Sequence, residues 1–101
     1  IKVIENINHL SNLVTLNLSS NLIKVVEGLK GLNKLKNLDL AGNLIPNTAA
    51  CEELLELPEL ASLDLKNNQI DDHDNFLTFF AKLTTLKAIY LRGNPGTRNV
   101  T

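Results

Sequence analysis

Four copies of one eleven-residue pattern constrain the fold of this chain more than any other feature. Each copy reads Leu-x-x-Leu-x-Leu-x-x-Asn-x-x, and the copies begin at Leu13, Leu35, Leu60 and Leu86. The first three end in isoleucine, and the fourth has Ile89 in place of its second leucine and Pro95 after its asparagine. Recurrence at offsets of 22, 25 and 26 residues predicts a stack of similar coils rather than a helical bundle.

The pattern has a direct physical meaning. The second and third leucines of each copy lie two residues apart, so a strand places both on its inward face and turns the residue between them outward. The chain must then turn, and the asparagine amide can bond backbone groups that this turn leaves unpaired. Stacked coils therefore predict a structural ladder of four asparagines: Asn21, Asn43, Asn68 and Asn94.

These offsets are those of a leucine-rich repeat. The predicted fold is α/β, a leucine-rich-repeat solenoid in the form of a right-handed βα superhelix. A short-stranded parallel sheet forms its concave face, and 3-10 or α-helical segments form its convex face. We expect strands over Thr15–Leu18, Asn37–Leu40, Ser62–Leu65 and Ala88–Leu91. Residues 1–101 are predicted to be one domain of about four and a half repeats, cut from a longer chain, with capping residues or a partner beyond both ends.

The convex segments differ in length along the chain. In the first two, apolar residues recur every third position, which predicts 3-10 turns with these side chains pointing inward: Ile4, Ile7 and Leu10, then Val26, Leu29 and Leu32. In the third, Thr48 can cap a helix over Ala49–Leu57 that Pro58 ends. In the fourth, Asp72 or Asp74 can cap a helix through Leu83, with a buried stripe of Phe76, Phe80 and Leu83.

A partner surface is predicted where the strands present side chains outward. The position between the paired leucines carries Asn17, Asp39, Asp64 and Tyr90 in turn. We predict that protein partners bind this concave face through seven residues: Asn17, Asn37, Asp39, Asp64, Lys66, Tyr90 and Arg92. Tyrosine and arginine favour this interpretation because they are common among interface residues that dominate affinity. For the smaller residues, a solvated sheet face with no partner is the simpler interpretation.

Composition excludes several other functions. The net charge is −1 and the pI is near 6.1, so no broad basic field is available for direct contact with nucleic acid or an anionic membrane. No apolar run approaches the roughly 20 residues that span a bilayer. Cys51 is the only cysteine, so an internal disulfide is impossible and a cytoplasmic address is predicted, with the nucleus as the alternative. The sequence does not indicate an oligomeric state.

No residues predict catalysis, a cofactor or a metal. The run Asp71-Asp72-His73-Asp74 lacks the glycine and distal glutamate of a calcium loop, and the other histidine of the chain, His9, lies far away in sequence. Helix capping explains this acidic run better. Cys51 lies beside Glu52 and Glu53, so we interpret it as a buried small residue rather than a nucleophile. We therefore expect a protein that is not an enzyme.

The repeats resemble a known family. Residues 1–10 and 23–32 share Ile-x-x-(Ile/Val)-Glu-x-(Ile/Leu)-x-x-Leu, which is similar to the intracellular leucine-rich class. The longer coil after Asn43, the run at 63–72 and the ending at 90–98 resemble the C-terminal repeats of the dynein axonemal assembly factor 1 family. That resemblance implies a non-catalytic module for cytoplasmic assembly or docking of axonemal dyneins, associated with the cilium. The family's Tyr-Arg capping motif is absent before the chain stops at Thr101.

Two alternatives follow from related members of the same class. A regulatory scaffold of protein phosphatase 1 is one, since that class is named after the yeast regulator of this phosphatase. A ribonucleoprotein component similar to the spliceosomal A-prime protein is the other, with RNA contact supplied by a partner. The axonemal dynein leucine-rich light chain and the acidic nuclear phosphoproteins have similar endings.

Overall fold

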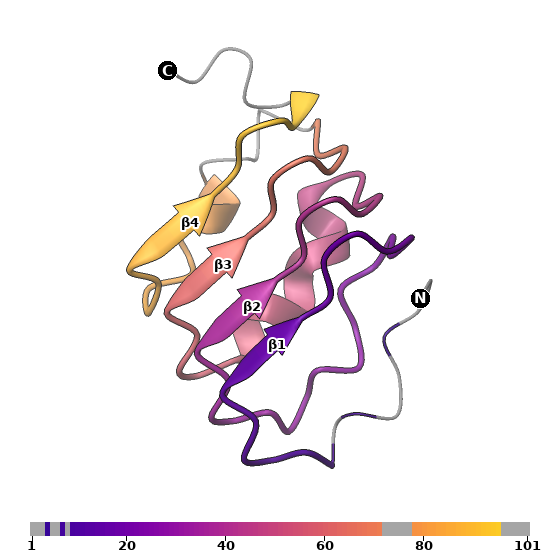
Figure 1. The fold of residues 1–101 in the computed structure, drawn as a ribbon. Coiled ribbons are helices and arrows are strands. Elements are labelled where there is room, and N and C mark those ends of the chain that lie inside the picture. The colour runs from indigo at the N-terminus through magenta and orange to yellow at the C-terminus, as the bar shows by residue number, and fades with distance from the viewer. Residues whose placement is uncertain (1–3, 5–6, 8, 72–77, 96–101) are drawn as a thin grey trace.

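The computed structural model describes residues 4, 7, 9–71 and 78–95. Within these residues, four short strands and one 3-10 helix follow one another along the chain. They are β1 (Thr15–Asn17), β2 (Asn37–Asp39), η1 (Thr48–Glu56), β3 (Ser62–Asp64) and β4 (Ala88–Tyr90). Figure 1 shows the strands side by side in one layer, with η1 in a second layer behind them.

The strands form one parallel sheet in the order β1-β2-β3-β4. Their register places Leu16, Leu38, Leu63 and Ile89 in one row and Asn17, Asp39, Asp64 and Tyr90 in the next. This is the alignment that the spacing of the leucines predicts. Each coil therefore adds one strand to the sheet, and equivalent positions of successive coils become neighbours in space.

The strands end one residue earlier than predicted. We expected them to include Leu18, Leu40, Leu65 and Leu91, but they stop at Asn17, Asp39, Asp64 and Tyr90. Pairing nevertheless continues past these ends, because the amide of Leu18 donates to the Asp39 carbonyl at 2.8 Å. At the ends of β1, β2 and β3, the side chains of Asn17, Asp39 and Asp64 begin a turn, as described below.

The core consists of aliphatic layers between the sheet and the convex segments. Eleven of its side chains are completely buried: Ile23, Leu29, Leu32, Leu35, Leu40, Ile45, Leu54, Leu60, Leu63, Leu65 and Ile70. Leu38 and Leu63 of the two inner strands are buried, whereas Leu16 and Ile89 of the outer strands are only partly buried. The apolar residue of each pattern is thus best covered where it has a coil on both sides.

The inward positions of the two short convex segments are confirmed in part. Val26, Leu29 and Leu32 are buried, as are Ile4 and, partly, Ile7, but Leu10 is 41% exposed. Leu10 was expected to point inward, and this prediction is wrong. It belongs to the first coil, which in the described residues has no coil before it to cover that side chain.

The predicted 3-10 geometry appears as isolated turns in the short coils. The amides of Leu32 and Leu35 each donate to the carbonyl three residues earlier, at 3.1 and 3.2 Å, without forming a helix. Gly28 and Gly31 have φ values of +74° and +98°, which no 3-10 helix accommodates. The glycines therefore limit this segment to single turns.

The third coil forms the helix expected, but with a different cap and pitch. The helix is the 3-10 helix η1, and the Asn47 side chain, not that of Thr48, accepts from the Ala50 amide at 3.0 Å. Thr48 is instead buried, on one stripe with Cys51 and Leu54. Side chains three apart eclipse in a 3-10 helix, so this spacing favours 3-10 over α geometry. The helix ends at Glu56, one residue before the predicted end, with Leu57 as its C-cap and Pro58 next.

The fourth coil is described only in part. Residues 78–80 are helical, and Phe79 and Leu83 are buried. Phe80, which was expected in the buried stripe, is only partly buried and packs edge-on against Phe79, with ring centroids 5.2 Å apart. The helix ends before Leu83 because the amides of Lys82 and Leu83 bond three residues back instead of four. The predicted capping residues Asp72 and Asp74, and Phe76, lie outside the described residues.

The asparagine ladder is present. Asn43, Asn68 and Asn94 are buried, and the amide nitrogen of each donates both to a carbonyl of its own turn and to one of the preceding coil. For Asn43 these carbonyls are those of Leu40, at 2.9 Å, and Leu18, at 3.0 Å. The Asn43 side-chain oxygen also accepts the amide of Ile23 in the preceding coil at 3.1 Å. Asn21 is half-buried and bonds Leu18 and Ser19 of its own turn.

The residue before each ladder asparagine has a positive φ. These residues are Ser20 (57°), Gly42 (70°), Asn67 (57°) and Gly93 (87°). Glycine and asparagine adopt this left-handed conformation at low cost, whereas serine does so less readily. Every turn of the stack therefore repeats the same backbone geometry, although only three of the four residues are well suited to it.

Candidate functional site

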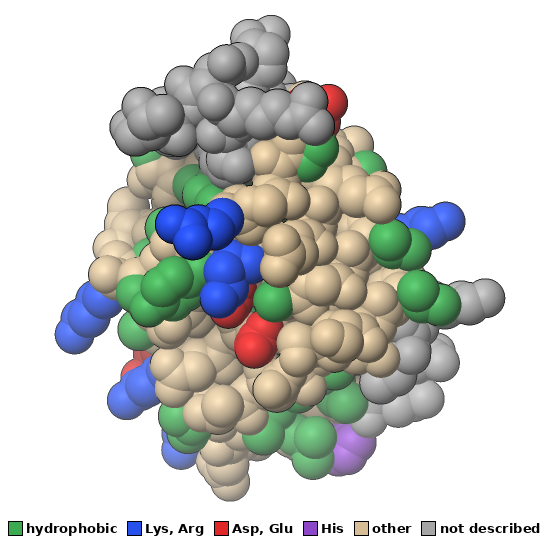
Figure 2. Space-filling model, turned by 45° about the horizontal axis from the view of Figure 1, so that its top comes forward, with side chains coloured by type: hydrophobic (Ala, Val, Ile, Leu, Met, Phe, Trp, Pro, Cys, Tyr) green, Lys and Arg blue, Asp and Glu red, His purple; other side chains and the backbone are tan. Residues whose placement is uncertain are grey.

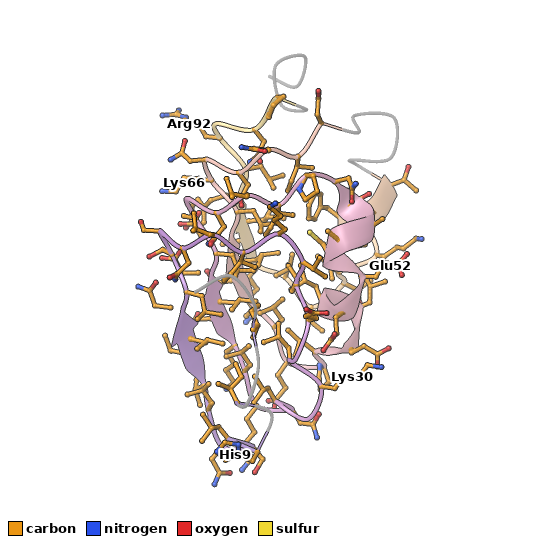
Figure 3. All side chains as sticks on the ribbon, turned by 90° about the vertical axis from the view of Figure 1, so that its right-hand side faces the viewer. His9, Lys30, Glu52, Lys66 and Arg92 are labelled. Atoms are coloured by element: carbon orange, nitrogen blue, oxygen red, sulfur yellow. The ribbon has the colours of Figure 1, made fainter. Side chains whose placement is uncertain are left out.

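The outward row of the sheet is the candidate site, and we call it the concave face. It comprises Asn17, Asp39, Asp64 and Tyr90, with flanking residues before and after each strand. Lys66 and Arg92, which follow β3 and β4, project on the same side of the molecule, away from Lys30 and Glu52 on the η1 side (Figure 3). The register brings five of the seven residues predicted for partner contact into one sheet, and the other two, Lys66 and Arg92, follow its last two strands: Asn17, Asn37, Asp39, Asp64 and Tyr90 lie in the sheet.

Three members of this row also shape the backbone. The side-chain oxygens of Asn17, Asp39 and Asp64 each accept the amide two residues further along, at 2.9, 3.0 and 3.0 Å. These Asx turns redirect the chain directly after each strand. Sequence analysis assigned these residues only to a partner surface, although an aspartate or asparagine before a turn is a recognisable signal. One oxygen of Asp39 and one of Asp64 therefore have a structural role.

The middle of the concave face carries a compensated charge pair beside an aromatic ring. The second oxygen of Asp64 lies 3.6 Å from the Lys66 ammonium nitrogen. The same nitrogen lies 5.7 Å from the centroid of the Tyr90 ring, within the range of a cation–π contact. These contacts connect β3 to β4 and hold Lys66 across the face. Tyr90 is nevertheless 49% exposed, so part of its ring remains open to a partner.

The charges of Asp39 and Arg92, on either side of this pair, have no ion-pair partner among the described residues. The guanidinium of Arg92 is exposed. The described part of the face therefore carries an unpaired negative charge on β2 and an unpaired positive charge after β4. Figure 2 shows acidic, basic and hydrophobic side chains gathered on the face turned toward the viewer.

A shallow hollow of about 230 Å³ lies on the same face. Its lining comes from all four strands, and Tyr90 stands at one side: Thr15, Leu16, Asn17, Asn37, Leu38, Asp39, Ser62, Asp64 and Tyr90. Sites for small molecules usually have volumes of about 300–1,000 Å³ and enclose most of the ligand. The hollow is below that range, so its size favours a side chain of a protein partner over a small molecule.

The Asn37 side chain already forms a hydrogen bond within the sheet. Its side-chain nitrogen donates to the Thr15 hydroxyl at 3.2 Å, across the β1–β2 pair. Both residues are exposed at the less charged end of the concave face. Of the predicted site, Asp39, Tyr90 and Arg92 therefore have the most capacity left for a partner.

Other predicted residues lie away from this face. The acidic run is described only at Asp71, because residues 72–74 lie outside the described residues. In the part of the chain that the structure describes, no group of three or more His, Cys, Asp or Glu side chains is placed to hold a metal ion. Cys51 is buried, as expected, and its thiol donates to the Asn47 carbonyl at 3.7 Å. Within the same residues, no helix has the length and hydropathy needed to cross a bilayer.

One polar contact on the convex side has a clear role that sequence analysis missed. A single oxygen of Glu53, in η1, accepts the amides of Leu29 and Lys30 in the preceding coil, at 2.8 and 3.0 Å. These amides follow Gly28, whose positive φ turns them toward the carboxylate. Spacing alone gives no signal for this contact, because the partners are more than 20 residues apart and one of them is backbone.

Comparisons with known proteins agree with this architecture. A leucine-rich-repeat family model matches residues 5–45. No curated protein matches the sequence. Among 27 similar chains of solved structures is an internalin (inlF) from Listeria monocytogenes, which is 24% identical with a TM-score of 0.68. The match covers 89% of this chain and 26% of the internalin, so the chain spans about a quarter of that protein's length.

The fold class follows from the sheet, the ladder and this likeness. The chain has the fold of a leucine-rich-repeat solenoid, of the α/β class, and residues 5–45 are similar to the leucine-rich-repeat family. At this level of identity the likeness to the internalin shows the fold alone.

Proposed function

We propose that this chain is a non-catalytic module that binds a protein partner on its concave face. The observation that carries the proposal is the exposure of Tyr90 and Arg92 at one end of the sheet, where neither side chain is buried in the core. Tyrosine and arginine supply much of the affinity in protein interfaces when a partner covers them. The small volume of the adjoining hollow supports a protein partner rather than a small ligand.

We further propose that the module acts in the cytoplasm, in assembly or docking of axonemal dyneins. The support is the resemblance of residues 63–72 and 90–98 to the dynein axonemal assembly factor 1 family. The phosphatase scaffold and the ribonucleoprotein component remain the alternatives from the same class. The three differ in the partner that they require.

Affinity purification from ciliated cells tests both levels of the proposal. The wild-type chain should retain dynein chains or their assembly chaperones, and Tyr90→Ala should lose them. Lys30→Ala, on the opposite side of the molecule, is the matched control and should retain them (Figure 3). Recovery of a phosphatase catalytic subunit or of spliceosomal proteins would replace the dynein role. Equal retention by the wild-type chain, Tyr90→Ala and Lys30→Ala would refute binding on the concave face.

A further inference from the structure

The charge distribution on the concave face points to the chemistry of the partner segment. Four charged side chains lie within the last three strands or two residues after them: Asp39, Asp64, Lys66 and Arg92. Asp64 and Lys66 compensate each other, with 3.6 Å between their charged atoms. Asp39 and Arg92 are the charges that no described residue compensates, and they lie at opposite ends of this group.

Their separation can be worked out from the register. Asp39 is aligned with Asp64 and then with Tyr90, and Arg92 follows two residues later. Two strand spacings of about 4.8 Å and two residues of about 3.3 Å give a diagonal of about 12 Å. An extended chain rises about 3.3 Å per residue, so this distance corresponds to about four residues of a segment lying across the strands. Side chains four apart in an extended segment point the same way.

We infer that the concave face binds an extended segment of a protein partner that carries a basic and an acidic residue four positions apart. The basic side chain faces Asp39 and the acidic side chain faces Arg92. The side chain midway between them points in the same direction and lies over β3. There the Asp64–Lys66 pair adjoins the half-exposed Tyr90 ring on β4, and contact with that ring favours an apolar or aromatic side chain at this position. This inference rests on the proposed function and specifies the partner of the same face.

The charge of Asp39 can be removed without losing the hydrogen bond that its side chain makes to the backbone. Asp39 closes its turn by accepting the Ala41 amide. Asn17 does the same for Ser19 on β1, so asparagine is already accepted at this position of the repeat. Asp39→Asn therefore removes the charge and keeps the turn. The Arg92 side chain is exposed and forms no ion pair with a described residue, so Arg92→Glu reverses a charge without breaking a fold contact of that kind.

A random twelve-residue peptide library displayed on phage provides the test. Selection on the wild-type chain should enrich peptides with a basic and an acidic residue four apart around an apolar one. A selected peptide should bind Asp39→Asn about 2- to 5-fold more weakly in fluorescence polarisation, as expected for one exposed ion pair. The same peptide with its basic residue changed to glutamine should bind both proteins equally. Arg92→Glu should weaken binding of the peptide, and replacement of the acidic residue of the peptide by lysine should restore it.

The results that would overturn the inference are distinct from those that would refute the proposed function. Peptides that require Tyr90 but show no four-residue charge spacing would overturn the inference and leave the proposed function intact. Peptides that are indifferent to Tyr90→Ala, Asp39→Asn and Arg92→Glu would refute both. Failure to enrich any peptide would overturn the inference as well. Unchanged urea midpoints of the variants are required, so that lost binding is not lost folding.

Discussion

Replacement of Asn68 by alanine should be one of the most destabilising single polar substitutions in this chain. The Asn68 amide nitrogen donates to the Leu40 and Leu65 carbonyls at 2.9 and 3.1 Å, and its oxygen accepts the Ile45 amide at 3.2 Å. Both carbonyls also accept a bond from a neighbouring ladder asparagine, so each keeps one partner in the variant. The Ile45 amide loses its acceptor in a buried location.

The magnitude follows from this difference. One buried amide left unpaired costs about 1–3 kcal/mol, and two lost bonds to carbonyls that stay paired add about 1 kcal/mol, so the total is about 3 kcal/mol. Asn21→Ala is the matched control, because Asn21 is half-buried and water can reach its turn. It should cost about 1 kcal/mol. Asn68→Asp keeps the acceptor for Ile45 but turns a carboxylate toward two carbonyls, so it should destabilise at least as much as alanine.

Urea unfolding followed by circular dichroism measures these values. The three variants should show lower midpoints with an unchanged slope, because the surface exposed on unfolding stays the same. If the free energies of unfolding lost in Asn68→Ala and Asn21→Ala differed by less than about 0.5 kcal/mol, burial of an asparagine would not determine how much it stabilises the fold. A stable Asn68→Asp variant would show that the donated bonds matter little.

Three further substitutions test other parts of the structure. Ser20→Gly should raise the free energy of unfolding by about 0.5–1 kcal/mol, because Ser20 has φ +57° and Gly42 already occupies the equivalent turn. A lower midpoint temperature of thermal denaturation would contradict this. Glu53→Ala should cost about 1–2 kcal/mol because the buried Leu29 amide loses its acceptor, whereas Glu53→Gln should cost less; equal losses in urea would exclude a role for the acceptor oxygen. Tyr90→Ala should change stability by less than about 1 kcal/mol, since the ring is half exposed, and a much lower unfolding midpoint would mean that Tyr90 serves the fold instead of a partner.

The features of the fold that repeat could be predicted from the sequence. Leucines two apart fix which side of a strand is buried, and the constant offset between the leucines and the asparagine of each copy fixes the register between coils. Both signals occur in all four copies of the pattern, so a wrong assignment in one copy can be recognised from the other three. The concave row from Asn17 to Tyr90 was predictable for the same reason.

The features that depend on one coil could not be predicted reliably. Asn47 and Thr48 are both suitable caps, and only packing decides that Thr48 is buried while Asn47 accepts the Ala50 amide. The burial of Phe79 rather than Phe80 depends on how the chain packs where the helical residues 78–80 end. The bonds from Leu29 and Lys30 to Glu53 depend on contacts between distant segments, which no spacing rule describes.

The ladder has a consequence for how this molecule can diversify. The bonds that Asn43 and Asn68 make between coils go to main-chain groups, so this part of the cohesion of neighbouring coils does not depend on which side chains the sheet displays. The exposed row of the sheet has one constraint from the fold, a side chain at 17, 39 and 64 that accepts the amide two residues later. Tyr90 has no such acceptor at the equivalent position of β4, so the turn can form without it. New specificities can therefore arise by exchanging exposed residues on an unaltered frame, with little penalty for folding.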